Sequence, residues 1–86
     1  MVKLNELKKH DPVIFVRTMP RLNYFEMFDC VVVNIDDKHC IVSDKKTKQS
    51  FLLHNKRAEE VLFTDRKLAL KYLRKEESKN ELREDY

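Results

Sequence analysis

Short apolar runs separated by polar segments occupy the first two thirds of the chain. β-Branched and aromatic residues dominate these runs, and Asn, Asp, Lys and Pro separate them, which predicts strands joined by turns. The predicted strands cover residues 13–16, 24–35, 39–43 and 49–54. Residues 61–63 (VLF) predict either a short fifth strand or the entry into a helix.

A helical pattern begins after the last apolar run. Thr64 is predicted as the N-cap, because its hydroxyl can accept from first-turn amides, and Asp65 suits the positive end of the helix dipole. Four apolar residues then share one helix face: Leu68, Ala69, Tyr72 and Leu73. Beyond this stripe the same face is polar, so we expect the helix to dock for about two and a half turns. The predicted domain therefore covers residues 1–74, and residues 75–86 form a polar helix extension or a disordered tail.

The side-chain alternation in the long second strand predicts which residues face the core. Asp29 interrupts its apolar set, which favours a bulge or sharp bend there. A two-residue turn at residues 36–37 would place Val33 opposite Cys40. The predicted core face then carries Met27, Val31, Val33, Ile35, Cys40 and Val42. Cys30 falls on the opposite face, so a Cys30–Cys40 disulfide is geometrically excluded in this register.

These elements indicate a mainly β (α+β) fold: a small five-stranded antiparallel barrel with a C-terminal helix. The layout resembles that of Src-homology-3-like small β-barrel proteins, with residues 11–16 (DPVIFV) opening the barrel and residues 61–64 (VLFT) leading into the helix. The chain has no Trp and lacks the acidic loop motif of the peptide-binding members, so proline-rich ligands are not expected. Because this architecture carries many unrelated functions, the layout leaves function open.

Composition narrows the classes of function. The 86 residues include no Gly, which excludes a glycine-rich phosphate loop, a dinucleotide fingerprint and a nucleophile elbow. No apolar run approaches the roughly 18 residues that span a bilayer, and the amino terminus has no signal-peptide pattern, so no membrane association is expected. The two cysteines form no paired motif, which favours a reducing, cytoplasmic setting.

The charge distribution gives the strongest functional signal. The net charge is only +3, but residues 38–57 hold six basic side chains against one acidic side chain. Such a window favours a phosphate backbone or an acidic protein surface. The candidate nucleic-acid contacts are Lys45, Lys46, Lys48, Lys56 and Arg57, with Tyr24 and Phe28 as stacking surfaces. Lysines are also common at the tips of ordinary solvent-exposed hairpins, where they protect strand edges from aggregation.

Two functions remain open at this point. One is a binding module that contacts nucleic-acid phosphates through the basic hairpin without strong sequence preference. The alternative is a protein-interaction module, such as a phage-type modulator of a host protein, which would use an exposed sheet edge or the face that carries Tyr24 and Phe28.

Catalysis and metal binding are not expected. The hydroxyl and thiol candidates have no surrounding catalytic motif, and the three histidines lie in different predicted elements. His39 and Cys40 are adjacent, so in a strand their side chains point to opposite faces, whereas structural zinc ligands usually pair about two to four residues apart. We therefore predict a non-enzymatic binding module without cofactor, metal or small-molecule substrate.

Overall fold

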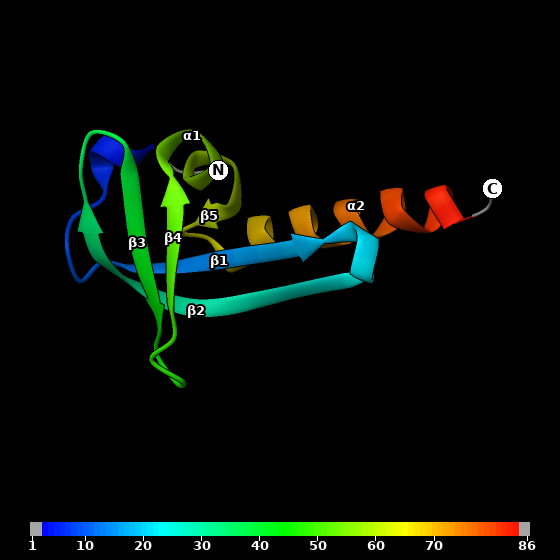
Figure 1. Cartoon of the computed structure of the whole chain (residues 1–86), viewed down its shortest axis with the longest axis horizontal. Helices are drawn as coiled ribbons and strands as arrows, with labels where there is room; N and C mark the ends of the chain where they lie inside the picture. The colour runs from blue at the N-terminus through cyan, green and yellow to red at the C-terminus, as the bar shows by residue number, and fades with distance from the viewer. Residues whose placement is uncertain (1–2, 85–86) are drawn as a thin grey trace.

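The computed structural model describes residues 3–84, with side chains through residue 81. Five strands, two α-helices and two short 3-10 turns follow one another along the chain (Figure 1). Their order is η1 (Leu4–Glu6), β1 (Pro12–Met19), η2 (Pro20–Leu22), β2 (Tyr24–Ile35), β3 (His39–Asp44), β4 (Ser50–His54), α1 (Asn55–Val61), β5 (Leu62–Phe63) and α2 (Arg66–Glu84). The predicted mainly β, α+β class with a C-terminal helix is confirmed.

The strands form one antiparallel sheet in the order β4-β3-β2-β1-β5. Within the described residues, β4 pairs only with β3 and β5 pairs only with β1, so the sheet is open. The layout is compatible with the predicted small β-barrel-like arrangement, but the sheet does not close. Strand β5 has only two residues, and both pair with β1.

The β2–β3 turn lies one residue later than predicted. The Asp36 carboxylate accepts from the amides of Lys38 and His39, at 2.8 and 2.7 Å. The Asp36 amide donates to the His39 carbonyl at 2.9 Å. The side chain thus selects a turn at residues 37–38, as Asx turns do, and Ile35 pairs with Cys40.

The later turn keeps the predicted faces, but a register shift between Val32 and Asn34 exchanges the face that the earlier part of β2 presents. The core face of these strands carries Cys30, Val32, Cys40 and Val42, all with no exposed surface. The prediction that Val31 and Val33 face the core was therefore wrong, and Val33 is 42% exposed. Of the bulge or sharp bend predicted near Asp29, the bulge is wrong, because the β1–β2 register runs unbroken from Pro12/Val31 to Met19/Tyr24.

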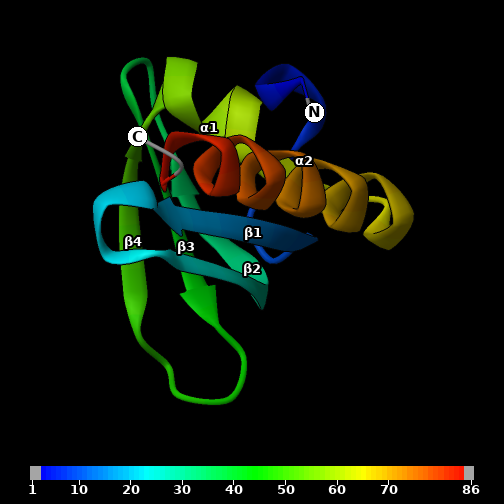
Figure 2. The ribbon, with the colours of Figure 1, turned by 90° about the vertical axis from the view of Figure 1, so that its right-hand side faces the viewer.

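The β1–β2 ribbon separates two hydrophobic cores. Val13 and Phe15 face β3, β4 and α1, whereas Ile14 and Val16 face α2. This burial on both faces explains why residues 13–16 form a continuous apolar run and not an alternating one. Figure 2 shows α2 lying over the ribbon on the side of the second core.

Helix α2 docks further along its length than the apolar stripe predicts. Asp65, and not Thr64, caps its start, since the Asp65 carboxylate accepts from the Lys67 amide at 2.8 Å. Asn80 is 5% exposed, and its side-chain amide donates to the Asn23 side-chain oxygen at 3.0 Å. Of the predicted tail, residues 75–84 continue this helix, and residues 85–86 lie outside the described part. No helix among the described residues is long and apolar enough to cross a membrane.

The one helix that the sequence pattern did not predict is α1, between β4 and β5. It buries two residues against the first core, Ala58 and Val61. Its other residues are polar, so its apolar face consists of only two residues and gives too little helical periodicity to be recognised in the sequence. Helices of this length are marginal in isolation, which means that α1 depends on this packing.

Candidate functional site

The loop between β3 and β4 carries three of the predicted basic residues. Lys45, Lys46 and Lys48 are all exposed, and we call residues 45–48 the lysine loop. Hydrogen bonds to Asp44, which is 7% exposed, stabilise the backbone of this loop. The Asp44 carboxylate accepts from the Lys46 amide at 2.8 Å, and the Asp44 carbonyl accepts from the Lys48 amide at 2.9 Å. The buried carboxylate therefore orders the backbone from which the lysines project.

One more hydrogen bond and one left-handed residue fix the backbone of the lysine loop. The Lys45 amide donates to the Asp29 carbonyl on β2 at 3.0 Å. Lys48 adopts the left-handed region with φ of 65°, which closes the turn without glycine. Among the side chains that the structure describes, no ion pair involves any of the three lysines.

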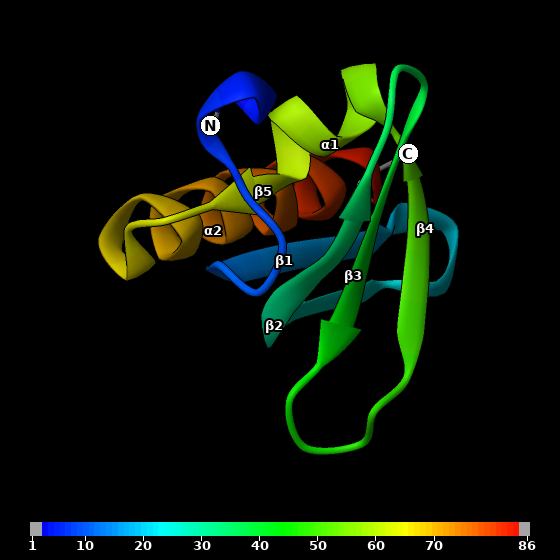
Figure 3. The same ribbon diagram turned by 90° about the vertical axis from the view of Figure 1, so that its left-hand side faces the viewer.

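The other two predicted cations, Lys56 and Arg57, lie in the first turn of α1. In Figure 3 the lysine loop projects from the end of β4 opposite α1. The Arg57 guanidinium is paired with Glu60 at 3.1 Å. The structure therefore divides the basic window into two groups at the two ends of β4.

Phe28, predicted to stack on bases, is part of an aromatic cluster. Its ring centroid lies 6.1 Å from that of Phe15 and 5.2 Å from that of Phe51. Phe28 is half-buried against the first core. Most of its ring therefore packs within the protein.

A cleft of about 250 Å³ lies between Phe28 and the lysine loop. Its charged lining residues are Glu26, Asp29, Asp44 and Lys46. Arg66 pairs with Asp29 from outside the cleft, which leaves two carboxylates against one ammonium. The structure brings Phe28 and Lys46 together, but in surroundings whose charge opposes a phosphate.

Tyr24, the second predicted stacking residue, lies at the start of β2 beside Arg17. Its hydroxyl donates to the Glu26 carboxylate, and this hydrogen bond raises the pKa of Tyr24. The Arg17 guanidinium carbon lies 5.9 Å from the Tyr24 ring centre and 5.4 Å from the Phe51 ring centre. Through these cation–π contacts, Arg17 on β1 connects the β1–β2 ribbon to β4, a strand with which the ribbon forms no backbone hydrogen bonds in the sheet.

Strand β4 is an edge of the sheet. Its hydrogen-bond pattern with β3 determines which of its backbone amides and carbonyls have no partner in the sheet. The Asp44 amide donates to the Gln49 carbonyl at 2.9 Å, and the Asn55 amide donates to the Lys38 carbonyl at 2.8 Å. Since hydrogen-bonded pairs alternate along an antiparallel ladder, Phe51 and Leu53 must bond to β3. The amides of Ser50, Leu52 and His54 then point away from β3, as do the carbonyls of Ser50 and Leu52.

We call Ser50, Leu52 and His54 the β4 edge. Their side chains also share the outer face of the sheet, since Phe51 and Leu53 pack against the first core. Leu52 is 65% exposed and pairs with Ile41 on β3. His54 pairs with His39, and their ring centroids are 5.7 Å apart. The free backbone groups are thus accompanied by a small apolar surface at Leu52.

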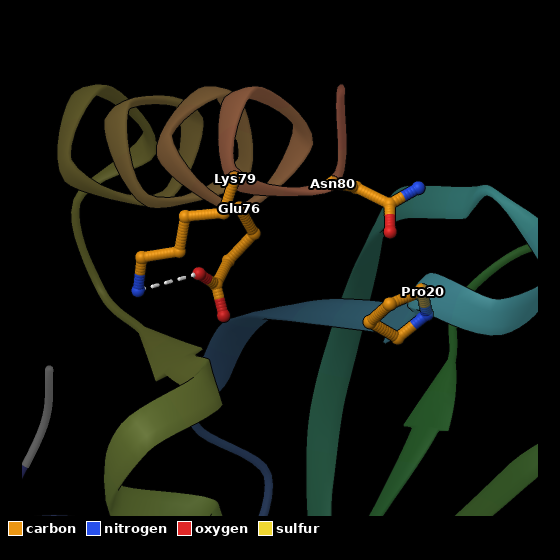
Figure 4. A pocket seen from close by; sticks show the side chains of 4 residues that line it. All are labelled: Pro20, Glu76, Lys79 and Asn80. Carbon is orange, nitrogen blue, oxygen red and sulfur yellow. Dashed lines mark ion pairs between the residues drawn. The ribbon is translucent and has the colours of Figure 1, made fainter. Parts of the chain in front are cut away.

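A smaller pocket lies on the other side of the β1–β2 ribbon, beside α2. Figure 4 shows a pocket of about 80 Å³ between η2 and α2, in which Lys79 pairs with Glu76 at 3.1 Å beside Pro20 and Asn80. It is too small for a typical ligand. Within the described residues, no three His, Cys, Asp or Glu side chains gather in a way that would hold a metal ion.

Both cysteines are free and lie in the first core. Burial raises the pKa of the Cys30 thiol to about 12 and also raises that of Cys40. They share a face, contrary to the predicted register, but Cys30 pairs with Asp44 and Cys40 with Ile35. Several residues of each strand therefore separate them, and they are buried core residues.

The β4 edge was not among the residues singled out from the sequence. Its signal is the alternation of residues 50–54, in which Phe51 and Leu53 alternate with Ser50, Leu52 and His54, together with the absence of charge. The chain matches no protein-family model, and comparisons with curated proteins and with solved structures also find no match.

Proposed function

We propose that the protein is a binding module that pairs an extended segment of a partner protein with strand β4. The observation that carries this proposal is the β4 edge itself: an uncharged five-residue strand with outward amides and an exposed leucine. Natural edge strands are usually protected by charged residues, proline or bulges within the strand. Addition of a partner strand would satisfy these backbone groups, as in other modules that recognise extended peptides.

A selection of peptides followed by substitution at Leu52 tests this proposal. Binders are selected from a random ten-residue library, and their affinity is measured for the wild type, Leu52→Pro and Leu52→Ala. Proline removes the outward amide without removing a ladder hydrogen bond to β3, which is the backbone position that edge strands tolerate. Leu52→Ala is the matched control that keeps the amide.

We expect Leu52→Pro to abolish peptide binding and Leu52→Ala to weaken it only a few-fold, since main-chain hydrogen bonds supply much of the affinity in this mode. Far-UV circular dichroism establishes that both variants remain folded. Equal binding by the proline variant, or a library that yields no binder, contradicts the proposal.

The lysine loop favours a second candidate, contact with nucleic-acid phosphates. Three exposed lysines on an ordered backbone form a local positive surface. Fluorescence anisotropy with labelled single- and double-stranded DNA and RNA tests this function at low and moderate salt. Binding that collapses with salt and with Lys45→Glu/Lys46→Glu/Lys48→Glu supports it, and no binding at low salt contradicts it.

A further inference from the structure

The two ends of strand β4 differ in charge, although both carry predicted cations. At the α1 end, Lys56 and Arg57 are followed by Glu59 and Glu60 on the same short helix. The adjacent β2–β3 turn adds two exposed carboxylates and one lysine: Asp36, Asp37 and Lys38. Opposite charges are therefore interspersed at this end, and they do not favour one sign of ligand.

The lysine-loop end is positive by contrast. Residues 45–50 contain three lysines and no acidic residue. The nearest carboxylate in the chain, Asp44, is buried and accepts the Lys46 amide. The acidic cleft beside Phe28 lies against β2, whereas the β4 edge lies on the opposite side of the hairpin, beyond β3. A ligand that follows β4 past Ser50 therefore meets the lysines first.

Distances along a strand bring the two features within reach of one ligand. An extended chain advances about 3.3 Å per residue. A partner segment paired with Ser50 and Leu52 needs only about one to three further residues to pass Lys48 and Lys46. The same segment presents one side chain beside Leu52 on the outer face of the sheet. On the other side of Leu52, the neighbouring residue is Ile41 of β3.

From this polarity, and resting on the proposed edge pairing, we infer that the partner segment has an apolar residue opposite Leu52 and a cluster of carboxylates at the end that passes the lysine loop. Charge complementarity identifies an acidic peptide as the occupant. A second copy of this chain fits less well, because a two-fold axis at Leu52 would direct Lys48 of one copy toward Lys56 of the other.

Synthetic peptides test the inference without knowledge of the natural partner. The probes share a five-residue Thr-Val-Thr-Val-Thr core. Each carries a tail of three identical residues at one end, and the tail is made of Asp, Lys or Ser. Each tail is placed at either the amino or the carboxyl end, because parallel and antiparallel pairing put opposite ends beside the lysine loop. Binding is followed by nuclear magnetic resonance, with the backbone amides of the β4 edge as the readout.

We expect one of the two Asp-tailed peptides to bind about five- to tenfold more tightly than the Ser-tailed peptide, because exposed ion pairs each contribute modestly. The Lys-tailed peptide should bind most weakly. The preference for Asp should disappear in high salt and in the Lys45→Glu/Lys46→Glu/Lys48→Glu variant. Lys56→Glu, a matched charge reversal at the other end of β4, should leave the preference unchanged.

The outcomes separate this inference from the proposed function. Equal affinity of the Asp- and Lys-tailed peptides, with the β4 edge still perturbed, overturns the inference and leaves edge pairing intact. Absence of any perturbation of the β4 edge overturns both. Tight binding of a ten-nucleotide single-stranded DNA to the lysine loop without perturbing the β4 edge assigns the lysines to nucleic acid and overturns the inference.

Discussion

Truncation of the neighbouring residues Phe51 and Leu52 should destabilise the protein to very different extents. Phe51 is 8% exposed, and its ring centroid lies 4.9 Å from Phe15 and 5.2 Å from Phe28. Phe51→Ala removes a buried ring, which costs about 3–5 kcal/mol. The stability of a domain of this size is about 4–13 kcal/mol, at roughly 0.05–0.15 kcal/mol per residue. Phe51→Ala therefore removes a large share of the stability, and at the lower end of this range it would unfold the domain.

Leu52 is 65% exposed, so about a third of its side chain contributes buried area. Full burial of a leucine is worth about 1.5–3 kcal/mol, and Leu52→Ala should thus cost about 0.5–1 kcal/mol. Phe51→Leu keeps most of the apolar area but removes two ring–ring contacts of about 0.5–1.5 kcal/mol each. Its expected cost of about 1–3 kcal/mol keeps the comparison measurable if Phe51→Ala does not fold.

Urea denaturation followed by far-UV circular dichroism measures these differences, since the chain has no Trp for fluorescence. The midpoint should fall in the order wild type, Leu52→Ala, Phe51→Leu, Phe51→Ala, with a similar denaturant slope where folding is two-state. A Leu52→Ala loss as large as that of Phe51→Leu would refute the assignment of Leu52 to the outer face. The β4 edge would then be part of the core.

Three further predictions concern stability elsewhere. Asn80→Ala should lower the free energy of unfolding by about 1–2 kcal/mol, because it removes a part-buried hydrogen bond made by a buried side chain, whereas Glu81→Ala on the exposed face should change it little. Because burial raises the thiol pKa values, to about 12 for Cys30, folded stability should be intact below pH 8.5 and fall as the pH rises toward 12. The slope of urea midpoints in this range should be shallower for Cys30→Ala/Cys40→Ala than for the wild type. Hydrogen bonds from the backbone amides of Lys38 and His39 hold the pKa of Asp36 below its usual range, so Asp36→Ala should destabilise the protein at neutral pH, and the difference from the wild type should shrink as the pH falls through the folded pKa.

Local sequence pattern was sufficient for most elements but not for their register. The strand at residues 24–35 was predicted with its observed bounds, because a long β-branched and aromatic run has few alternatives. The faces were wrong because of the register shift between Val32 and Asn34. The later turn at Asp36 moves the pairing by two residues and by itself keeps the same faces. A one-residue change in register exchanges the faces of a strand.

The candidate site depended on tertiary information that the sequence pattern does not contain. The basic window of residues 38–57 is contiguous in the sequence, but Lys56 is separated from the lysine loop because β4 lies between them. Phe28 resembles an exposed aromatic until the packing of Phe15 and Phe51 against it is known. The edge position of β4 follows from strand order, which no local alternation specifies.

Hydrogen–deuterium exchange of the five β4 amides tests the edge assignment most directly. In the free protein, the amides of Ser50, Leu52 and His54 should exchange fast, whereas those of Phe51 and Leu53 should be protected by bonds to β3. A saturating peptide from the library selection should slow the first set and leave the second unchanged. Protection of all five amides in the free protein would contradict a free edge, and a bound peptide that slows only residues 45–48 would contradict strand pairing.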